Sequence, residues 1–464
     1  MNTQDTICAI ATAQGGAIGV IRISGKDAIA ITDRIFTPVG KHPLPLSERK
    51  AYTMAFGHIR QDDGEIIDEV LIGLFKSPHS YTGEDCVEIS CHGSSFILQQ
   101  VMQLLIRKGC RAAGPGEFTQ RAFLNGKMDL SQAEAVADLI ASSSAATHRM
   151  AMNQMRGGFS RELSALRERL LHLTSLMELE LDFSDHEELE FADRSELETI
   201  AADIEKVISG LVHSFSVGNV LKNGIPVAIV GETNAGKSTL LNTLLNEEKA
   251  IVSDIHGTTR DVIEDTVNLS GITFRFIDTA GIRDTHDTIE NMGIARSFHK
   301  MEQAEIVLWV VDNTCAEAQI RQLSPRILPL CSNKQLIILL NKSAQVSPVP
   351  TKLSGLPENT VTLSISAKEK TGIQELQNLL VKTVSVPELT SSDLIVTNVR
   401  HYEALSLALE DIHRVQNGLQ THLSGDFISQ DLRECLFHLA EIVGGEITAD
   451  EVLGNIFMKF CIGK

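Results

Sequence analysis

Three patterns of hydrophobic and polar residues follow one another along the chain. Residues 1–119 contain short β-like runs, among them GAIGVIRIS, DEVLIGLF and DCVEISCHG, around one helix-like run, SSFILQQVMQLLIRKG. Alternation of apolar and polar residues indicates a half-buried strand, whereas an apolar repeat of three and four residues indicates an amphipathic helix. The mixture predicts an N-terminal α+β domain.

From residue 120 to residue 216 the apolar repeat becomes helical. The run DLSQAEAVADLI opens with Ser131 and Glu134 at the spacing of a capping box, which is a helix start signal. The run RELSALRERLLHLTSLMELELDF continues the repeat until the acidic run DFSDHEELEFADRSELE interrupts it. A further helix is predicted to end near residue 215, and VGNVLKNGIP, which starts at residue 217, has the composition of a linker.

Residues 217–384 show a third pattern, in which apolar runs alternate with helical stretches. The runs are PVAIVG, TFRFIDTAG, AEIVLWVVDN, QLIILLNKS and VTLSISAK, and they are rich in Val, Ile and Leu. Continuous apolar runs of this kind indicate parallel strands that are buried on both faces of a sheet. We therefore expect an α/β domain with a mostly parallel sheet.

Helical sequence returns over residues 385–464, where two predicted helices end at Asn417-Gly418 and at Gly444-Gly445. Because helical sequence flanks the α/β block on both sides, the simplest organisation is a helical domain with an α/β domain inserted into it. The chain is thus predicted to be a multidomain α/β and α+β protein. Its predicted domains are 1–119 (α+β), 120–216 and 385–464 (the two parts of the helical domain) and 217–384 (the inserted α/β domain).

Composition sets limits on the function. The chain has 464 residues and a formal net charge of −19, so a nucleic acid would need a local basic patch or a partner protein in order to bind. The N-terminus lacks the basic start of a secretory signal, and no apolar run approaches the ~20 residues of a membrane span. The eight cysteines are scattered and fit reduced thiols. We therefore expect a cytoplasmic protein without membrane contact.

The stretch GETNAGKST at residues 231–239 matches the P-loop pattern G-x-x-x-x-G-K-[ST]. It follows a predicted strand and precedes a predicted helix, which is the context that a P-loop requires. Its backbone N–H groups would surround phosphate oxygens, and the helix N-terminus would add its dipole. Lys237 would reach the β- and γ-phosphates, and the hydroxyl of Ser238 would hold Mg²⁺.

Two further motifs follow in the order that is typical of a switch-type NTPase. In DTAG, Asp278 would bind Mg²⁺ through water, and the N–H of Gly281 would sense a γ-phosphate. In GTTRD, at residues 257–261, Thr259 would close over the metal. Each motif is weak alone, but together with the P-loop they predict a nucleoside triphosphatase.

The residues that would assist hydrolysis are less evident. Ile282 stands where Ras-like proteins have the glutamine that positions water, so another group must orient the attacking water. Glu290 is a candidate, although spacing alone favours a solvated carboxylate at a helix start. Arg260 and Arg283 could stabilise the transition state or could be surface charges. Asn234 in the P-loop offers an amide oxygen to a monovalent cation, which could replace the charge of an arginine finger.

The sequence predicts a guanine pocket that lacks one element. Asn341 and Lys342 follow one strand, and SAK at 366–368 follows the next, as in proteins that read guanine. Ala344 occupies the position of the usual Asp, whose carboxylate accepts two N–H bonds from the base and contributes ~3 kcal/mol. Its loss should weaken guanine selectivity without removing phosphate binding. We expect GTP to be the substrate, read by Asn341, Lys342 and the N–H of Ala367.

With these residues in view, the chain resembles the MnmE (TrmE) family of tRNA-modification GTPases over essentially its whole length. The resemblance includes DTICAIAT and GVIRISG, YTGEDCVEISCHG at 81–93, GPGEFTQRAFLNGKMDLSQAEAVADLI at 114–140, the nucleotide motifs and the terminal CIGK. It implies an N-terminal tetrahydrofolate-binding and dimerisation domain, a helical domain and an inserted G domain. It also implies that the protein acts with a flavin-dependent partner, MnmG (GidA). Together they would add a folate-derived aminomethyl or carboxymethylaminomethyl group to C5 of the wobble uridine of certain tRNAs.

The resemblance also implies roles for individual residues, position by position. Glu290 would orient water, Ser238 and Thr259 would hold Mg²⁺, and hydrolysis would be stimulated by potassium with G-domain dimerisation. The potassium ion would be surrounded by Asn234, Ser253, Ile255 and Thr258. A tetrahydrofolate derivative (5-formyl- or 5,10-methylene-) would contact Arg22, Glu88, Lys127 and Lys464. The expected GTP-binding residues are Asn234, Ala235, Gly236, Lys237, Ser238, Thr239, Ser253, Asp254, Ile255, His256, Gly257, Thr258, Thr259, Asp278, Thr279, Ala280, Gly281, Asn341, Lys342, Ser366, Ala367 and Lys368.

Two other functions stay open from the residues alone. One is a GTP-switched RNA or ribosome assembly factor without modification chemistry, which should carry a basic RNA-binding extension that we do not find. The other is a degenerate G domain, which Ala344 suggests and the intact Lys237, Ser238, Thr259 and Asp278 oppose. Cys461 could be a reactive thiol or a small packed residue.

Overall fold

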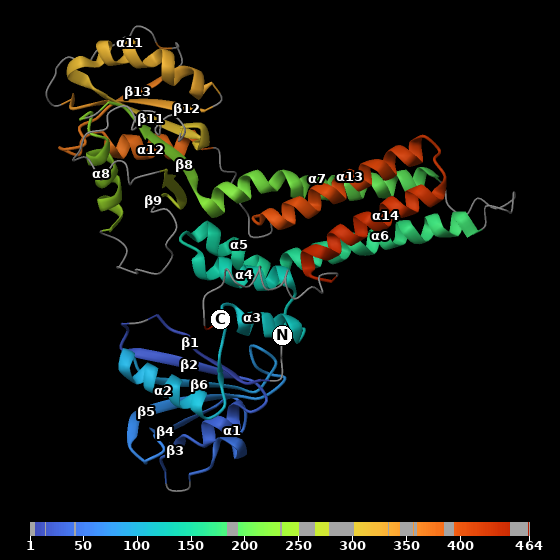
Figure 1. Ribbon diagram of the computed structural model, residues 1–464. Coiled ribbons are helices and arrows are strands. Elements are labelled where there is room, and N and C mark those ends of the chain that lie inside the picture. Colours follow the sequence, from blue (N-terminus) through green and yellow to red (C-terminus); the bar gives the residue numbers. More distant parts are fainter. Residues whose placement is uncertain are drawn as a thin grey trace. The chain divides into compact units, whose positions relative to one another are not determined.

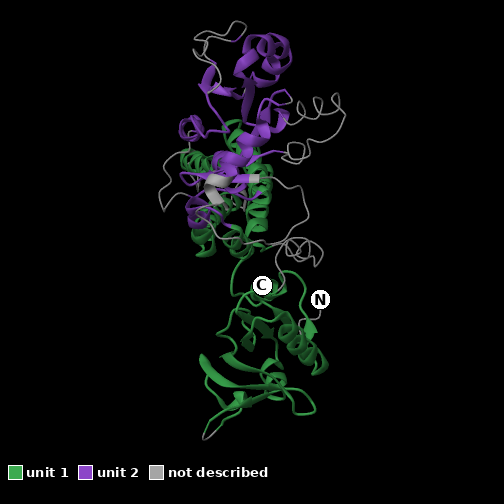
Figure 2. Cartoon of the chain, turned by 90° about the vertical axis from the view of Figure 1, so that its left-hand side faces the viewer, with its two compact units in different colours: residues 1–141, 151–210, 399–464 green, residues 142–150, 211–398 purple. Residues whose placement is uncertain are grey.

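A computed structural model of the chain describes residues 5–13, 15–40, 43–182, 194–232, 234–249, 265–277, 301–332, 334–343, 356, 360–384, 394–445 and 463. These residues form two compact units, which Figure 2 shows in different colours. Unit 1 comprises residues 1–141, 151–210 and 399–464, and unit 2 comprises residues 142–150 and 211–398. Unit 2 therefore lies within the sequence of unit 1.

The N-terminal part of unit 1 is a seven-stranded sheet in the order β3-β4-β5-β6-β2-β1-β7 (Figure 1). Neighbouring strands are antiparallel except for β1 and β7. The strands are β1 (Ile7–Ile10), β2 (Ile18–Ser24), β3 (Phe36–Pro38), β4 (Thr53–Arg60), β5 (Ile66–Phe75), β6 (Cys86–His92) and β7 (Arg111–Ala112). Alternate residues such as Ile21, Ile72 and Val87 are buried against α1 (Ala28–Asp33) and α2 (Ser95–Arg107). The predicted α+β domain is confirmed.

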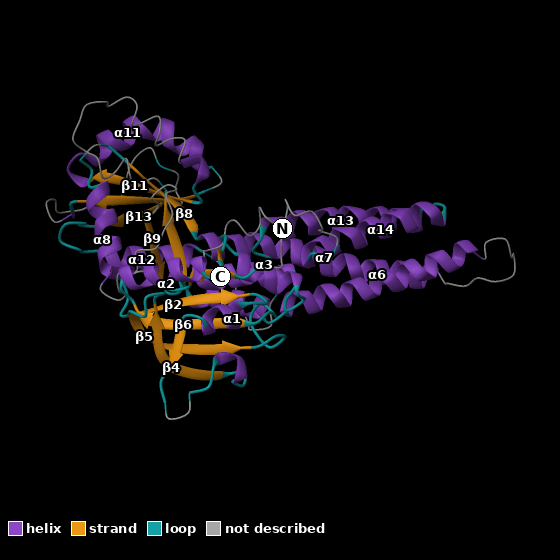
Figure 3. Cartoon of the chain, turned by 60° about the horizontal axis from the view of Figure 1, so that its bottom comes forward, coloured by secondary structure: helices purple, strands orange, loops and turns teal. Residues whose placement is uncertain are grey.

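The rest of unit 1 is helical, and Figure 3 shows the long helices extending side by side. Its helices are α3 (Glu117–Leu124), α4 (Leu130–Ala141), α5 (Ala145–Met155), α6 (Gly158–Asp182), α7 (Arg194–Asn223), α13 (Val399–Gln420) and α14 (Gly425–Val443), of which α5 and α7 extend into unit 2. α14 packs against both α13 and α6. Sequence from both sides of unit 2 therefore builds one helical bundle.

The N-terminal cap of α4 differs from the prediction. Asp129 and Gln132 form the reciprocal pair: Gln132 N donates to Asp129 Oδ1 at 2.9 Å, and Asp129 N donates to Gln132 Oε1 at 3.0 Å. Ser131 and Glu134, the predicted capping box, lie inside the helix. Glu134 accepts hydrogen bonds from Arg400 on α13 instead. The spacing of a capping box thus occurs twice in this stretch, at Asp129 and Gln132 and at Ser131 and Glu134. The sequence pattern alone selects the second pair, whereas the first pair caps the helix.

Two glycines that suggested chain breaks lie within helices. The predicted linker VGNVLKN is the last part of α7, in which a Cβ on Gly218 would lie 2.1 Å from the carbonyl oxygen of Val396. The predicted stop at Asn417-Gly418 lies inside α13, and a Cβ on Gly418 would lie 3.0 Å from Ile428. Both glycines permit close packing, whereas Gly444 does cap α14 with a φ of 86°. The predicted boundary at 216/217 is thus crossed by a continuous helix.

Unit 2 is built on a six-stranded sheet in the order β13-β12-β11-β8-β10-β9. All neighbours are parallel except the edge pair β9 and β10, and β9 was not predicted. The strands are β8 (Ile225–Val230), β9 (Asp265–Leu269), β10 (Ile272–Phe276), β11 (Ile306–Asp312), β12 (Gln335–Asn341) and β13 (Val361–Ser364). The core on one face includes α8 (Lys237–Lys249) and α12 (Ile373–Thr383), and the core on the other includes α11 (Ala316–Ile327). The predicted parallel α/β domain is confirmed.

Short 3-10 helices complete the described elements. They are η1 (Leu46–Glu48), η2 (Asn313–Cys315) and η3 (Leu328–Cys331). Within the described residues, no helix is both long enough and apolar enough to cross a membrane.

Candidate functional site

The P-loop connects β8 to α8, at the carboxyl end of a central parallel strand. Gly231, Asn234 and Gly236 have φ angles of 146°, 65° and 99°, so the loop turns sharply before the helix begins at Lys237. Glycine is required at two of these positions, because a Cβ on Gly231 would lie 2.2 Å from the carbonyl oxygen of Val310, and one on Gly236 would lie 2.1 Å from the amide nitrogen of Asn341. Backbone and helix N-terminus thus have the arrangement of a phosphate-binding loop.

Lys237 lies folded over the P-loop. Its ammonium group donates to the carbonyl oxygens of Gly231 at 2.8 Å and Glu232 at 2.7 Å. Burial lowers the pKa of Lys237, and the nearby carboxylate of Glu232 opposes this effect. A phosphate would offer the ammonium group a full negative charge in place of two carbonyl dipoles, and charge-assisted hydrogen bonds are the stronger kind. The position fits the predicted role of Lys237.

Asn341 joins the P-loop to the loop that carries SAK. It ends β12 and is 3% exposed. Its Nδ2 donates to the carbonyl oxygen of Ala235 at 2.8 Å, and its Oδ1 accepts from the N–H of Ala367 at 3.0 Å. Thr243 on α8 donates to the carbonyl oxygen of Ala367 at 3.0 Å. The side chain of Asn341 thus holds together two loops that would otherwise be linked only through the sheet.

Lys342 is held by a carboxylate that sequence reasoning missed. Its φ is 64°, and its ammonium group contacts Asp312, the last residue of β11, at 2.5 Å. Although burial opposes the charged form, the hydrogen bonds from Lys342 and Thr314 lower the pKa of Asp312. Asp312 could have been found as a polar residue at the carboxyl end of a buried parallel strand, where ligands of such sheets bind.

A second set of contacts fixes the first residues of the P-loop. Gln319 on α11 donates to the carboxylate of Glu232 at 2.8 Å and accepts from the N–H of Asp312 at 2.9 Å. The P-loop, the end of β11 and Lys342 therefore form one connected network. No motif in the sequence identifies Gln319, because its role depends on tertiary contacts.

The remaining predicted residues of the nucleotide site fall into two groups. Four of them are described: Ser238 lies in the first turn of α8, Thr239 follows it, and Ser366 and Lys368 flank Ala367. The predicted residues outside the described part of the chain are Ser253, Asp254, Ile255, His256, Gly257, Thr258, Thr259, Asp278, Thr279, Ala280, Gly281, Glu290 and Lys464, together with Ala344.

A second cluster lies on the N-terminal sheet of unit 1 around Arg22. Arg22 on β2 faces Glu88 on β6, and its Nε and Nη2 contact Oε1 of Glu88 at 2.9 and 2.8 Å. Its Nη1 donates to the carbonyl oxygen of Gly463 at 3.3 Å. The guanidinium also lies 5.4 and 5.7 Å from the ring centroids of Tyr81 and Phe118. Two of the predicted folate residues are thus in contact, and the segment next to Lys464 reaches them.

Lys127, another predicted folate residue, lies against the loop that carries Tyr81. Its ammonium group donates to the carbonyl oxygen of Pro78 at 3.0 Å, and its stem packs beside Gly83. Asn125 donates to the carbonyl oxygen of Thr82 at 2.7 Å. The loop at 78–83 thus connects Lys127 to the cluster around Arg22.

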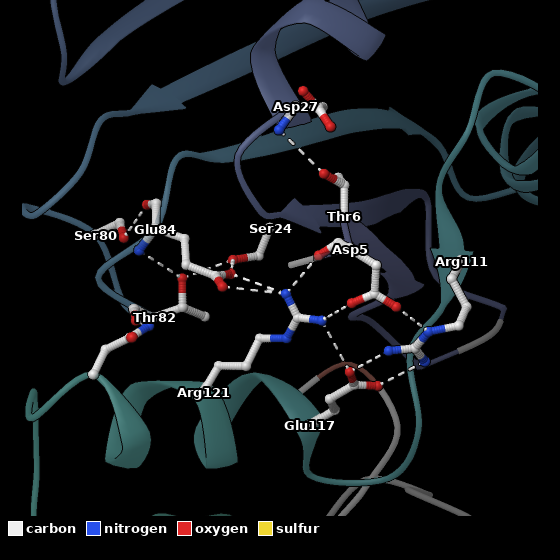
Figure 4. Close-up of polar contacts among 11 residues, drawn as sticks. Asp5, Thr6, Ser24, Asp27, Ser80, Thr82, Glu84, Arg111, Glu117 and Arg121 are labelled. Carbon is white, nitrogen blue, oxygen red and sulfur yellow. Dashed lines mark hydrogen bonds and ion pairs between the residues drawn. The ribbon is translucent and has the colours of Figure 1, made fainter. Parts of the chain in front are cut away.

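Figure 4 shows the network of charged residues around the buried Arg121, which fixes this region. Arg121 on α3 is 3% exposed and donates to the carboxylates of Asp5 at 2.5 Å, Glu84 at 3.2 Å and Glu117 at 3.1 Å. Arg111 donates to Asp5 and Glu117 as well. Despite burial, these hydrogen bonds lower the pKa values of Asp5 and Glu117. Segments that are far apart in the sequence are thereby locked together beside Tyr81.

The parallel sheet, the P-loop at the start of α8 and the Asn-Lys pair held against it together define a P-loop GTPase. The whole chain also matches known proteins. A family model described as "MnmE helical domain" matches residues 130–461, and one described as "GTP-binding protein TrmE N-terminus" matches residues 6–127. The chain therefore belongs to the MnmE family of tRNA modification GTPases.

Individual relatives agree over their full length. A protein named tRNA modification GTPase MnmE from Bacteroides thetaiotaomicron is 66% identical over 467 residues, which cover 99% of this chain and 100% of the relative. Proteins of the same name from Phocaeicola vulgatus and Flavobacterium johnsoniae are 62% and 52% identical, and each alignment covers 100% of both chains. The resemblance stated from the sequence is confirmed.

Proposed function

We propose that this protein hydrolyses GTP in unit 2 and, with a flavin-dependent partner of the MnmG (GidA) type, adds a folate-derived aminomethyl or carboxymethylaminomethyl group to C5 of the wobble uridine of certain tRNAs. The observation that carries this proposal is the combination, in one chain, of the Asn341-bridged P-loop with the Arg22 cluster. The first is built to bind a nucleotide, and the second is a separate polar site in another unit.

For hydrolysis, the chemistry of the donor set fits the proposed ions. The hydroxyl groups of Ser238 and Thr259 and the carboxylate of Asp278 are hard oxygen ligands of the kind that Mg²⁺ takes. Asn234 is exposed in the P-loop at a φ of 65°, where its amide oxygen could join Ser253, Ile255 and Thr258 around K⁺. Mg²⁺ would neutralise phosphate charge, and K⁺ would supply the charge that an arginine finger provides elsewhere. Glu290 is the proposed group that orients water.

For the one-carbon step, the cluster around Arg22 has the chemistry that a folate requires. A pterin ring offers N–H donors and a flat face, so the carboxylate of Glu88 and the partly exposed ring of Tyr81 suit it. The glutamate tail is anionic, so Lys127 and Lys464 suit the tail. When bound, a tetrahydrofolate derivative would supply the one-carbon unit, and these residues would bind and orient it.

A homodimer is part of the proposal, and an exposed sheet face supports it. Met54 and Phe56 on β4 and Leu71 on β5 are 63%, 50% and 37% exposed, and they lie on the same face because Phe56 and Leu71 are direct cross-strand partners. An apolar face of this kind on a soluble domain is typical of an interface. We propose a cytoplasmic homodimer that assembles further with its flavin-dependent partner and tRNA.

The nucleotide part is tested by steady-state hydrolysis of GTP and ATP with the purified protein, in potassium and in sodium buffer. We expect hydrolysis of GTP only, with stimulation by potassium, and a Glu290→Gln variant should lose turnover while it retains GTP binding. Equal hydrolysis of GTP and ATP would show that the pocket with Ala344 no longer reads guanine. The tRNA part is tested by analysis of wobble nucleosides in a deletion strain, and full modification there would refute it.

A further inference from the structure

A cavity of about 460 Å³ lies in the helical part of unit 1, where α5 gives way to α6. Polar side chains line it, namely Gln132, Arg156, Ser160, Arg161, Ser164 and Glu168. None of these residues belongs to the P-loop site or to the cluster around Arg22. The cavity is therefore a feature that the proposed function leaves unexplained.

One face of α6 borders this cavity. Leu163, Leu166 and Leu170 are buried on the opposite face of the helix. Arg161, Ser164 and Glu168 recur at intervals of three and four residues and are exposed. The geometry of an amphipathic helix thus places the guanidinium of Arg161 in solvent at the cavity rather than in the bundle core.

The charge of this region is opposite to that of the whole chain. Residues 151–172 contain four arginines, at 156, 161, 167 and 169, and two carboxylates, Glu162 and Glu168. The chain as a whole has a formal net charge of −19. A polyanion is repelled by most of such a surface and attracted by a locally positive one.

The two arginines of the cavity are not neutralised by carboxylates within the described residues. Arg161 donates to the carbonyl oxygen of Arg156 at 3.0 Å, and neither guanidinium forms an ion pair with a described carboxylate. In the same unit the arginines of α13 and α14 are paired: Arg400 with Glu134, Arg414 with Asp431, and Arg433 with Glu178. Guanidinium groups without a carboxylate retain their donors for an external anion.

We infer that this cavity binds the phosphate backbone of tRNA, an inference that rests on the proposed function. Arg156 and Arg161 would donate to phosphate oxygens, and the hydroxyl of Ser164 would add a neutral donor. Glu168 would repel a free anion, but it can accept a hydrogen bond from a ribose 2′-hydroxyl, so a ribose–phosphate chain fits this lining better than inorganic phosphate. Contacts of this kind position an RNA without reading its bases.

The test is binding of a fluorescent, unmodified tRNA to the full-length protein, measured by anisotropy over a range of salt concentrations. An Arg156→Gln/Arg161→Gln variant should bind about tenfold more weakly, and the slope of log K against log salt should fall by about 2, because two phosphate contacts are lost. Arg167→Gln is the matched control, since Arg167 is an exposed arginine of the same helix that does not line the cavity. It should change the affinity less than twofold.

A second pair of variants tests the location without removing an arginine. Ser164→Glu adds a negative charge inside the cavity, and Ser175→Glu adds the same charge further along α6, outside it. Both serines are exposed, so both variants should fold. Only Ser164→Glu should weaken tRNA binding, and GTP hydrolysis should be unchanged in all of these variants.

The outcomes separate this inference from the proposed function. If the wild-type protein binds tRNA and the cavity variants bind it equally well, the inference is wrong and the proposed function stands. If the wild-type protein binds no tRNA and its deletion leaves wobble uridines modified, both are wrong. If the cavity variants and the control variants weakened tRNA binding to the same degree, the effect would be one of general charge. That result would also refute the cavity as the tRNA site.

Discussion

Single side chains in the nucleotide site act by holding other groups in place. Asn341 spans the P-loop and the SAK loop, Asp312 holds Lys342, and Gln319 holds Glu232. Since Ala344 stands where a guanine pocket normally has a carboxylate, we expect the orientation of Lys342 to matter more for nucleotide affinity here than in a complete guanine pocket. Asp312 is therefore a positioning residue for Lys342.

An Asp312→Asn variant should raise the KM for GTP about fivefold and leave kcat within twofold. The ion pair is partly exposed, so its loss should weaken binding by ~1 kcal/mol, equally for substrate and transition state. Thr314→Val is the control, because it removes a 2.8 Å hydrogen bond to Asp312 but keeps the ion pair. Steady-state kinetics distinguish the two, and a loss of kcat at unchanged KM would contradict a positioning role.

The sequence predicts some residues of the nucleotide site, and it misses others there and in the charge network around Arg121 for a physical reason. Lys237 and Asn341 can be found because a short motif fixes their place at a strand end. Gln319 and Arg121 cannot, because their partners lie 87 and up to 116 residues away in the sequence and are brought to them only by folding. Motifs identify residues whose geometry is local, and they miss residues that position others across elements.

At the scale of elements, a buried ion pair joins α4 to α13. Glu134 is 8% exposed and contacts Arg400 at 2.9 Å and His401 at 2.7 Å. Although burial acts in the opposite direction, hydrogen bonds from His401 and Arg400 lower the pKa of Glu134 to about 2. This contact ties sequence before unit 2 to sequence after it, so it should matter for the integrity of the bundle.

A Glu134→Gln variant should lower the free energy of unfolding of the helical bundle by about 3 kcal/mol at pH 7, because the half-buried Arg400 and the buried His401 both lose the carboxylate that they contact. Glu178→Gln is the control, since Glu178 and Arg433 form an exposed pair between α6 and α14 whose loss should cost under ~1 kcal/mol. Urea unfolding followed by far-UV circular dichroism measures both. If both variants lost the same free energy of unfolding, burial would not determine how much an ion pair stabilises the bundle.

The same residue predicts a pH dependence. The folded pKa of Glu134 is about 2, below the ordinary value of 4.5, so the charged form stabilises the folded state. This stabilisation is complete above pH 4.5 and is lost as the pH falls from there toward 2. The difference in stability between wild type and Glu134→Gln should therefore shrink over that window. A constant difference between pH 6 and pH 3 would contradict it.

The two glycines of α7 should respond in opposite ways to alanine. Gly218→Ala should destabilise by about 2 kcal/mol, because its Cβ would lie 2.1 Å from the carbonyl oxygen of Val396. Gly210→Ala should stabilise by about 0.5–1 kcal/mol, because nothing lies within 4 Å of a Cβ there and alanine favours a helix. Thermal unfolding of both variants measures the sign, and a stabilising Gly218→Ala would contradict the close contact.

Glycines within helices also show which element boundaries cannot be predicted from the sequence. The helical repeat predicts the long helices of the bundle, and the apolar runs predict five of the six strands in unit 2. Glycine, however, has two uses in a helix, as a terminating residue and as a place where another chain segment approaches closely. Only the packing partner, Val396 for Gly218 and Ile428 for Gly418, distinguishes them.

At the scale of the whole molecule, the two units should unfold separately, and Trp309 makes this measurable. It is the only tryptophan of the chain, and it is fully buried in β11 of unit 2. GDP with Mg²⁺ at 100 times its Kd should stabilise unit 2 by about 2.7 kcal/mol, since the ligand binds only the folded form. Tryptophan fluorescence in urea should shift to a higher midpoint.

The control for this prediction is the same titration followed by hydrogen exchange of amides in α13 and α14, which belong to unit 1. Their protection should not change with nucleotide. If both units shift together, they unfold as one cooperative body, and the division into two units would not describe the stability of the chain.

The contact between Arg22 and the carbonyl oxygen of Gly463 spans 441 residues of sequence. A ribosome adds about 5–20 residues per second, so roughly 20 to 90 s separate the synthesis of these two partners. Once its last strand, β7, has been synthesised, the sheet of unit 1 is complete in sequence, but the cluster around Arg22 still lacks the segment at residue 463. A chain released before residue 463 by a nonsense codon or a stalled ribosome would therefore lack the carbonyl group that Arg22 contacts, and the cluster would stay unfinished.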